Sequence, residues 1–333
     1  MHPPRRLRDV CDPGVDLSLS HAMTQSPFLP AFDAARAGDM AVGTADATDA
    51  HADAVARWYR ADPACITAID AHAHVFVRGL PLAPQRRHAP DYDATLDAYV
   101  AHLCANRISH AVLVQPSFLG TDNSFLLDVL RRYPRRFRGV VVVDPAIDPE
   151  QLATLAREGV VGMRLNLLGL PLPDLRDARW QALFERINAF GWHVEVHREA
   201  ADLPQIVGAL LDADCTVVVD HFGRPDPSLA VDDPGLRFLL SAASSGRVWV
   251  KLSAAYRSAI DTDGTQHGQR LAALLLEHFT PARLVWGSDW PHTQHQHLVD
   301  YDATWAALAQ WVPEREARET ILVDSARRLF RFD

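Results

Sequence analysis

The sequence predicts a single (β/α)8 barrel with an N-terminal extension. From residue 66 onward, short runs rich in Val, Ile and Leu alternate with longer segments of helical spacing, and we count eight such runs. Several runs are almost continuously apolar, which is typical of strands buried on both faces of a parallel sheet. Eight strands that alternate with helices form a closed barrel, and a doubly wound open sheet is the alternative. The positions of the polar residues decide between the two.

The expected strands are short, and helical patterns fill the intervals between them. The strands are expected at residues 66–76, 108–115, 137–143, 160–166, 193–197, 216–220, 248–252 and 284–287. The helices are expected at residues 91–106, 122–133, 175–190, 203–212, 236–244, 269–279, 301–311 and 314–329, with one more beginning at Asp148. Local signals support these limits, since Pro149 occupies a first-turn position and Gly191 follows its helix as a C-cap.

Residues 1–60 differ in composition from the barrel expected over residues 61–333. They are rich in Ala, Asp, Pro and Ser and have weak periodicity. We interpret them as an extension that is partly disordered or packed on the barrel. A helix over residues 44–59, with Thr44 as its N-cap, is compatible with this segment. We assign no chemistry to it.

Composition and charge exclude several classes of function. The 333 residues carry 33 basic and 42 acidic side chains, for a net charge of −9, so nucleic acid is not an expected partner. No run of about 18 apolar residues predicts a membrane span, and no apolar segment of a secretory signal follows the N-terminal arginines. The four cysteines are scattered without a C-x-x-C pair, so a reducing cytoplasm fits best. A homo-oligomer is compatible with these features.

Two histidines stand at the end of the first expected strand. His72 and His74 are two residues apart, and alternate residues of a strand point to the same face. Both imidazoles therefore enter one space, as binding of a metal or an oxyanion would require. In a barrel of this kind the C-terminal ends of the strands carry the active site. The alternative is two ordinary histidines with hydrogen-bond partners at a strand end.

Three more polar residues end other expected strands. His197 ends the fifth strand, His221 follows the sixth, and Asp289 follows the eighth. One histidine at a strand end is weak evidence, but all four histidines fall at the same predicted end of the barrel. A carboxylate beside imidazoles can bind a metal or take a proton from water. The alternative for Asp289 is a role in a turn or a helix cap, and we interpret His193, at the start of its strand, as structural.

The order of these motifs resembles the amidohydrolase superfamily. More narrowly, it is similar to the amidohydrolase-related group (amidohydrolase 2), which includes pyrone-dicarboxylate hydrolases and sugar-acid lactonases. The likeness covers residues 66–333. The matching segments are DAHAHVF at 70–76, GMRLN at 162–166, VDHFGRPD at 219–226, VKLSAAYR at 250–257, WGSDWPH at 286–292 and DSARRLFRF at 324–332. The resemblance implies a barrel hydrolase that opens a carboxylated lactone, as in the catabolism of aromatic compounds.

The resemblance also implies roles for particular residues. His72, His74 and His197 correspond to positions that bind a metal or polarise the carbonyl. Asp289 corresponds to the residue that activates water, and His221 to a histidine near the reacting centre. If a metal is present, its ligands would be the first three histidines and the aspartate, and one zinc ion is expected. A site without metal is the alternative.

Arginines predict a small anionic substrate. Arg164 and Arg257 match positions that hold substrate carboxylates, which guanidinium groups bind bidentately. The alternative for each is a salt bridge to an acidic neighbour. Arg164 also stands where a lysine that bridges two metals would be needed, so two metals are not expected. Tyr256 and Ser253 are candidates for hydrogen bonds to the substrate, and Lys251 is a candidate inward-facing cation.

One departure from the resembled group bears on the substrate. A pyrone-dicarboxylate hydrolase is expected to have a further basic residue shortly after the strand-four arginine, whereas residues 167–172 read LLGLPL. A lactone with one anionic group therefore fits as well as a dicarboxylate. We expect a lactonase in which Asp289 is the general base. The alternatives are a metal-dependent decarboxylase of the same superfamily, which would release carbon dioxide, and a barrel that only binds an anion.

Overall fold

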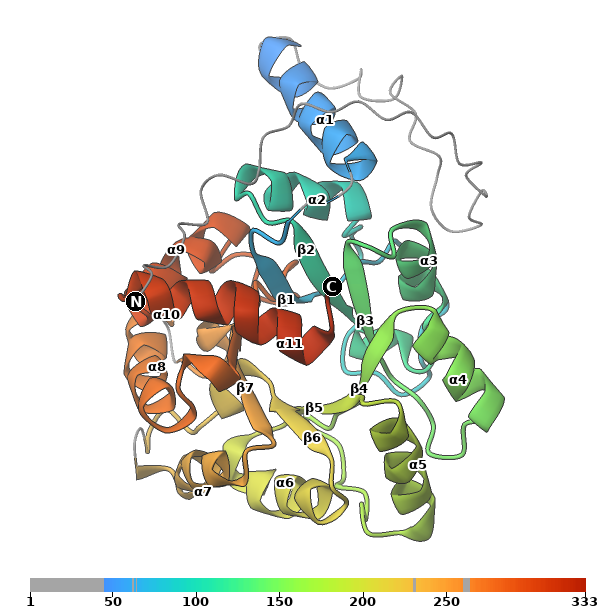
Figure 1. Cartoon of the computed structure of the whole chain (residues 1–333), viewed down its shortest axis with the longest axis vertical. Coiled ribbons are helices and arrows are strands. Elements are labelled where there is room, and N and C mark those ends of the chain that lie inside the picture. The colour runs from blue at the N-terminus through green and yellow to red at the C-terminus, as the bar shows by residue number, and fades with distance from the viewer. Residues whose placement is uncertain (1–44, 62, 64, 230–231, 260–263) are drawn as a thin grey trace, which may run out of the picture.

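The computed structural model describes residues 45–333 except 62, 64, 230–231 and 260–263, and it contains eight parallel strands around one axis (Figure 1). The strands pair in chain order from β1 to β8. They are β1 (Ile69–Ala73), β2 (His110–Val114), β3 (Phe137–Val141), β4 (Val160–Asn166), β5 (His193–His197), β6 (Thr216–Val219), β7 (Val248–Leu252) and β8 (Leu284–Trp286). Each strand lies within its predicted range, and the predicted barrel is confirmed.

The barrel closes between β1 and the segment that follows β8. The amide of Asp289 donates to the His72 carbonyl at 2.8 Å, and the amide of His74 donates to the Trp290 carbonyl at 2.8 Å. Gly287 permits this close approach, because a Cβ at that position would lie 2.4 Å from the Cβ of His72. The closure therefore sets Asp289 beside the two histidines of β1.

Helices alternate with the strands and pack around the barrel. They are α1 (Ala45–Arg60), α2 (Leu96–Ala105), α3 (Ser124–Arg132), α4 (Pro149–Arg157), α5 (Ala178–Ala189), α6 (Leu203–Asp212), α7 (Pro234–Ala242), α8 (Thr265–Phe279), α9 (Tyr301–Trp311), α10 (Arg315–Glu319) and α11 (Ala326–Phe330). A π-helical turn, Thr320–Ser325, joins α10 to α11 and interrupts the last predicted helix. None of the described helices is long and apolar enough to cross a membrane.

The second helix begins later than predicted. Its expected start was residue 91, but α2 begins at Leu96. Ala94 is held in an extended pair with Phe76, whose amide donates to the Ala94 carbonyl at 2.9 Å. Thr95 then acts as the N-cap, because its hydroxyl accepts a hydrogen bond from the amide of Ala98. The residues before this cap form part of the loop that follows β1.

Helix α1 packs against α2 on the outer surface of the barrel (Figure 1). Val55 and Trp58 are buried, and the Trp58 indole donates to the carbonyl of Ile108 at 3.1 Å. These contacts attach the last part of the N-terminal extension to the barrel. Residues 1–44, including the expected N-cap Thr44, lie outside the described residues.

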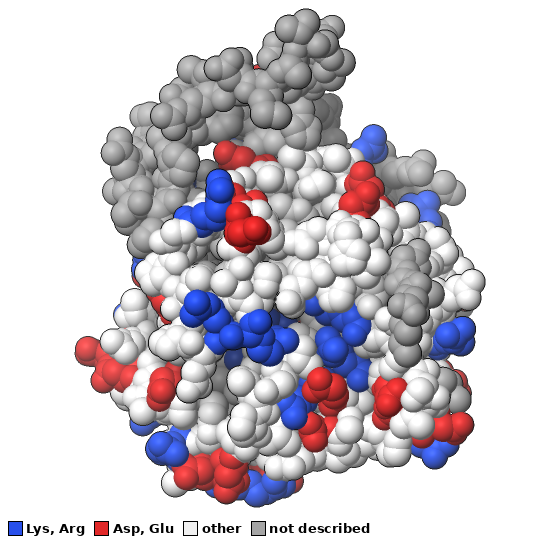
Figure 2. Space-filling model, turned by 180° about the vertical axis from the view of Figure 1, so that it is seen from behind, with Lys and Arg blue, Asp and Glu red and all other residues white. Residues whose placement is uncertain are grey.

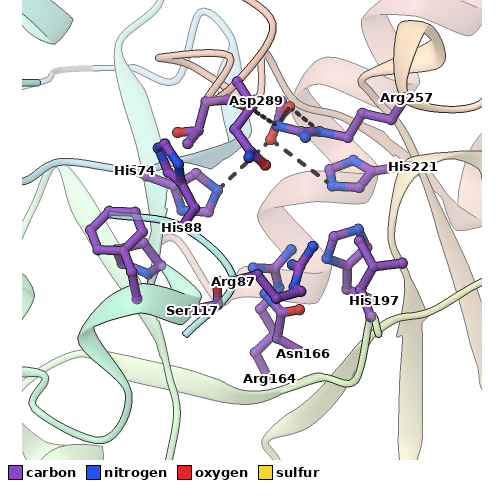
Figure 3. Close-up of a pocket in the computed structure, with 15 residues that line it drawn as sticks. His74, Arg87, His88, Ser117, Arg164, Asn166, His197, His221, Arg257 and Asp289 are labelled. Atoms are coloured by element: carbon purple, nitrogen blue, oxygen red, sulfur yellow. Dashed lines mark hydrogen bonds and ion pairs between the residues drawn. The ribbon is translucent and has the colours of Figure 1, made fainter. Parts of the chain in front are cut away.

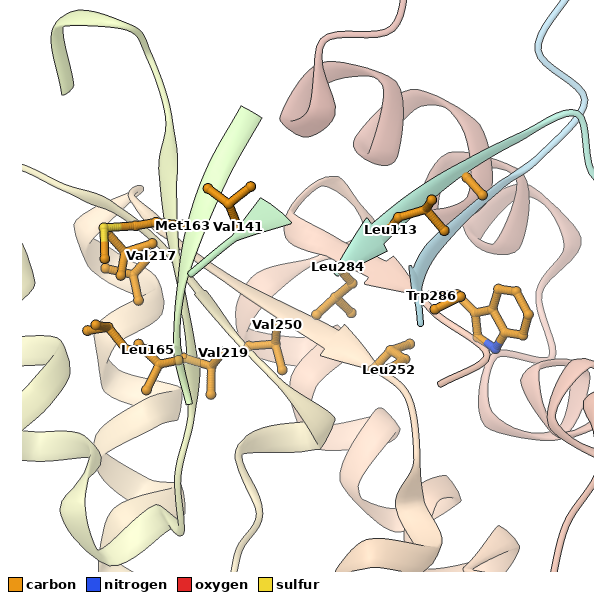
Figure 4. Close-up of a cluster of buried hydrophobic side chains, with 14 of the residues drawn as sticks. Leu113, Val141, Met163, Leu165, Val217, Val219, Val250, Leu252, Leu284 and Trp286 are labelled. Atoms are coloured by element: carbon orange, nitrogen blue, oxygen red, sulfur yellow. The ribbon is translucent and has the colours of Figure 1, made fainter. Parts of the chain in front are cut away.

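Strand side chains alternate between two cores. The outward-facing set packs against the helices (Figure 4) and includes Leu113, Val141, Met163, Leu165, Val217, Val219, Val250, Leu252, Leu284 and Trp286. Inside the barrel, Ile69, Val112 and Val140 form a second core with Phe330 of α11. This C-terminal helix crosses the end of the barrel that faces the viewer in Figure 1. The opposite end, where the strands finish, is left for polar residues.

Candidate active site

A pocket lies at the C-terminal ends of the strands (Figure 3). Six of the predicted residues line it: His74, Arg164, His197, His221, Arg257 and Asp289. The structure therefore brings together side chains from six strands or the segments that follow them. Figure 2 shows the face opposite to that of Figure 1, and basic side chains gather near its middle. An anionic ligand is favoured at such a surface.

Asp289 has two oxygens with different surroundings. Its Oδ2 accepts hydrogen bonds from the Tyr256 hydroxyl and from Arg257 Nε, the latter at 2.8 Å. The predicted substrate ligands Tyr256 and Arg257 thus contact the carboxylate of Asp289 (Figure 3 shows the arginine contact). The pair orients the carboxylate and leaves its other oxygen directed toward the histidines.

Oδ1 of Asp289 faces a group of imidazoles. It lies 3.6 Å from His72 Nε2, 3.7 Å from His74 Nε2 and 3.9 Å from His221 Nε2. Oδ1 is buried and has no hydrogen-bond partner among the described protein groups. Buried oxygens normally have such a partner, so Oδ1 is available to accept a hydrogen bond from a molecule in the pocket.

The electrostatic surroundings keep Asp289 ionised. Burial alone would raise the pKa of its carboxyl group, but the Arg257 guanidinium and the adjacent imidazoles hold that pKa well below its usual value. Burial lowers the pKa of His72 and His221. The site therefore combines a carboxylate with neutral imidazoles at neutral pH, which is the state needed to take a proton from water.

Three of the strand-end segments contain residues in the left-handed backbone region. His221 has φ 53°, Ala254 has φ 48° and Asp289 has φ 60°. Such conformations cost about 1–3 kcal/mol in a residue other than glycine and persist where the surroundings enforce them. They occur after β6, β7 and β8, so the backbone turns sharply just where the functional side chains must be aimed into the pocket.

His74 is fixed by a bond to a strand. Its Nδ1 lies 2.7 Å from the carbonyl oxygen of Val114 on β2. A carbonyl can only accept, so Nδ1 carries the hydrogen and Nε2 presents a lone pair to the pocket. This is the arrangement of a histidine that binds a metal or accepts a hydrogen from water.

His72 has the opposite tautomer to His74, and this bears on whether the predicted metal site can form. Two groups have ligand atoms within 4.8 Å of one another among the described residues, and both include His72: His72, His74 and Asp289, and His72, Asp220 and His221. However, His72 Nδ1 lies 2.9 Å from the ammonium of Lys251. An ammonium has no lone pair, so Nδ1 must accept and Nε2 must carry the hydrogen. A metal that uses all of either group therefore does not fit.

His197 and Ser253 occupy positions that differ from their predicted roles. His197 is in neither group of potential ligands, although it lines the pocket and its ring centroid lies 4.9 Å from that of His221. Both nitrogens of His197 are buried without a hydrogen-bond partner among the described protein groups. Ser253 is buried behind the pocket, where its hydroxyl lies 2.8 Å from His221 Nδ1. It contacts a catalytic candidate rather than the pocket itself.

Arg164 forms a buried ion pair below the pocket. Its Nε and Nη2 donate to Asp220 Oδ2 at 3.0 and 2.8 Å. The alternative considered for this arginine, a salt bridge, is thus present. Arg164 still lines the pocket, so its cation contributes to the charge that a substrate meets.

Arg87 is a pocket residue that the sequence did not indicate. It belongs to the loop between β1 and α2, is exposed, and has no ion-pair partner among the described residues. It packs against the loop after β4, because a Cβ on Gly169 would lie 3.3 Å from Arg87 Cδ. That loop is the apolar segment LLGLPL at residues 167–172, where no cation was found. No sequence signal could connect two loops so far apart in the chain.

Comparison with known proteins gives consistent results. The sequence model of the amidohydrolase family matches residues 69–332. A 2-pyrone-4,6-dicarboxylate hydrolase from Comamonas testosteroni is 33% identical over 79% of this chain and 90% of its own length. A 4-sulfomuconolactone hydrolase from Hydrogenophaga intermedia is 30% identical over 78% of this chain and 88% of its own.

Solved structures agree with the sequence comparisons. A protein from Pseudomonas putida, described as a 2-pyrone-4,6-dicarboxylic acid hydrolase, is 46% identical, with a TM-score of 0.77 over 81% of this chain and 99% of that chain. A protein of the same description from Acinetobacter baumannii, with citric acid bound, is 37% identical, with a TM-score of 0.78 over 80% of this chain and 100% of that chain.

Proposed function

Because the chain belongs to the amidohydrolase family, we propose that it hydrolyses a lactone that carries carboxylate groups, with Asp289 as the general base. The observation that carries this proposal is the free Oδ1 of Asp289, buried among three imidazoles at 3.6–3.9 Å. The relatives described as lactone hydrolases support the type of reaction.

The water molecule binds between Asp289 and His74 in the proposed reaction. Asp289 Oδ1 and His74 Nε2 are both acceptors and lie 3.7 Å apart, so one water can donate a hydrogen to each. Its oxygen lone pair then points toward the substrate carbonyl. Attack on that carbonyl forms the new C–O bond as Asp289 takes the proton.

The oxyanion that forms is stabilised by hydrogen-bond donors close to Asp289 Oδ1. His72 Nε2–H, 3.6 Å from that oxygen, is such a donor, and His221 lies beside it with the ring centroids 4.9 Å apart. One donor of this kind typically contributes about 3–4 kcal/mol. When the tetrahedral intermediate collapses, the ring C–O bond breaks and Asp289 returns its proton to the leaving oxygen. The products are a carboxylate and a hydroxyl group on one open chain.

The substrate is proposed to carry more than one carboxylate. Arg257 and Arg164 line the pocket, and Arg87 adds a cation beside residues 167–172. This third arginine compensates for the missing basic residue of that loop, so a dicarboxylate becomes the favoured substrate. The citric acid bound to the related Acinetobacter protein supports a polycarboxylate ligand.

A panel of lactones tests the proposal. Pyrone dicarboxylates, muconolactones and sugar-acid lactones are supplied to enzyme prepared without a histidine tag and treated with chelator, and proton release and carbon dioxide are measured together. We expect proton release without carbon dioxide, fastest with a dicarboxylated lactone. Carbon dioxide release would instead indicate the decarboxylase. Tight binding of the dicarboxylates with neither product would indicate a barrel that only binds anions.

A further inference from the structure

A buried cation lies on the inner surface of the barrel, in contact with His72. Lys251 projects from β7 and is fully buried. Its Nζ lies 2.9 Å from His72 Nδ1 and 3.3 Å from Asp220 Oδ1, and it also donates to Glu195 Oε1. An ammonium has three hydrogens, and three acceptors surround this one. The proposed reaction assigns no role to it.

The contacts of Lys251 identify it as an ammonium. Glu195 Oε1 accepts a hydrogen bond from Nζ, and both side chains are fully buried. A buried carboxylate requires a partner of opposite charge, and the Lys251 ammonium supplies it. The contact with Asp220 supplies a second negative charge to the same cation.

The distances show whether His72 Nδ1 donates a hydrogen bond to Asp220 or accepts one from Lys251. If that nitrogen carried a hydrogen, its acceptor would have to be Asp220 Oδ1, which lies 3.6 Å away. A separation of 3.6 Å is too long for a hydrogen bond, whereas the 2.9 Å contact with Lys251 has the normal length. The ammonium therefore donates, and Nδ1 accepts.

The sequence supplies an independent observation. Lys251 is the only lysine in the chain, and the remaining 32 of its 33 basic residues are arginines. A planar guanidinium is wider than an ammonium and presents its hydrogens in a fixed fork. Three acceptors gathered around one point suit the compact ammonium. The one position that has lysine is thus the one where arginine would not reproduce the contacts.

We propose that Lys251 is a positioning residue that acts through His72: by donating to Nδ1 it places the ring hydrogen on Nε2, so that His72 donates a hydrogen bond to the substrate carbonyl. This role rests on the proposed lactone hydrolysis. The two histidines of the β1 motif then have opposite tautomers, because the Val114 carbonyl places the hydrogen of His74 on Nδ1. His74 accepts from water while His72 donates to the substrate.

Nuclear magnetic resonance of the wild-type protein tests the contact directly. Lysine labelled with 15N at Nζ gives one side-chain signal, because the chain has one lysine. Histidine labelled with 15N in the ring, with His72→Gln to assign the signal, reports which nitrogen carries the hydrogen. We expect a protonated ammonium and a His72 hydrogen on Nε2. A hydrogen on Nδ1 of His72, or a neutral amine at Lys251, would overturn the proposal.

Two variants test the consequence for catalysis. Glu195→Gln keeps the Lys251–His72 contact, whereas Glu195→Gln with Lys251→Met removes it without leaving an unpaired buried charge. We expect the double variant to lose roughly 10²–10³-fold in kcat relative to Glu195→Gln, the usual effect of removing one oxyanion donor, with KM little changed. Equal kcat in the two variants would show that Lys251 serves only as the counter-ion of Glu195.

The two proposals can fail separately. If no lactone of the panel is hydrolysed, the proposed function fails, while the resonance measurement still reports the His72 tautomer. If lactones are hydrolysed but His72 carries its hydrogen on Nδ1, the proposed function stands and the role of Lys251 is overturned. Should the double variant not fold, as circular dichroism would reveal, the wild-type measurement decides the question alone.

Discussion

The two ends of the barrel interior differ in the polarity of their buried side chains. At the end closed by α11, most inward-facing side chains are apolar, as with Val112 and Val140 against Phe330, and the buried His193 packs on the same ring. At the end where the strands finish, several buried polar atoms have no hydrogen-bond partner among the described residues, namely Asp289 Oδ1, His72 Nε2 and both nitrogens of His197. The first arrangement stabilises the fold, whereas each unpaired buried group costs about 1–3 kcal/mol.

Residues at the closed end should therefore stabilise the fold, whereas residues at the open end should act on a substrate. The closed end buries apolar surface that contributes about 25 cal/mol for each Å² removed from water. The open end holds strained and unpaired groups that a substrate and water can satisfy. Substitutions at the two ends should therefore change different measurements, and four predictions examine this.

The largest effect is expected at the open end, from Asp289→Asn. The amide cannot take a proton from water, so kcat should fall about 10²–10⁴-fold. Arg257 and Tyr256 still hold the side chain in place, so binding of a carboxylated ligand should persist when measured by titration calorimetry. Asp128→Asn, a buried aspartate on α3 outside the pocket, is the control and should retain full kcat. Retained turnover in the Asp289 variant would remove it as the base.

The next effect is expected at the closed end, from Phe330→Ala. This fully buried ring closes the inner core, so its loss should lower the free energy of unfolding by about 3–5 kcal/mol. Urea denaturation measures this change. At a temperature where the variant stays folded, kcat and KM should match those of the wild type. A strong loss of kcat without a loss of stability would mean that the two ends are coupled.

The sequence predicted the fold better than the contacts inside the pocket. The strands are apolar runs with short-range patterns, so their ranges could be read directly. The strand-end histidines and Asp289 could also be found, because strand direction alone sets which end of the barrel they occupy. The pairing of Arg257 with Asp289, at 2.8 Å, could not, since it depends on where two separate loops meet.

The same reason explains the other differences. Arg164 and Asp220 are 56 positions apart, and only the closed barrel shows that they form an ion pair. Arg87 belongs to a loop without a regular pattern, so no feature of the sequence predicts its contact with residues 167–172. Lys251 was recognised as a candidate inward cation, but its hydrogen-bond partner His72 is 179 positions away.

A smaller effect is expected at the rim of the open end, from Arg87→Gln. Loss of one charge-assisted hydrogen bond at an exposed position should raise KM for a dicarboxylated lactone about tenfold, which corresponds to roughly 1.4 kcal/mol. KM for a monocarboxylated lactone should change little. Arg86→Gln is the matched control, because this exposed neighbour donates to the Ala83 carbonyl and does not line the pocket. Equal changes for both substrates would argue against a specific carboxylate contact.

The smallest effect is expected from a change of pH, to which activity and stability should respond in different ranges. Burial lowers the pKa of His72, His197 and His221 below the ordinary value of 6.5, so kcat/KM should show no inflection near pH 6.5 and should fall only in more acidic solution.

Stability should respond at higher pH than activity. In the unfolded chain these histidines take up protons near pH 6.5, whereas in the folded chain they do not, so the free energy of unfolding should decrease as the pH falls below 6.5. Urea denaturation between pH 5 and 8, beside kcat/KM over the same range, compares the two curves. An activity inflection at pH 6.5 that coincides with the loss of stability would contradict this prediction. It would mean that water reaches these imidazoles and that burial does not lower their pKa.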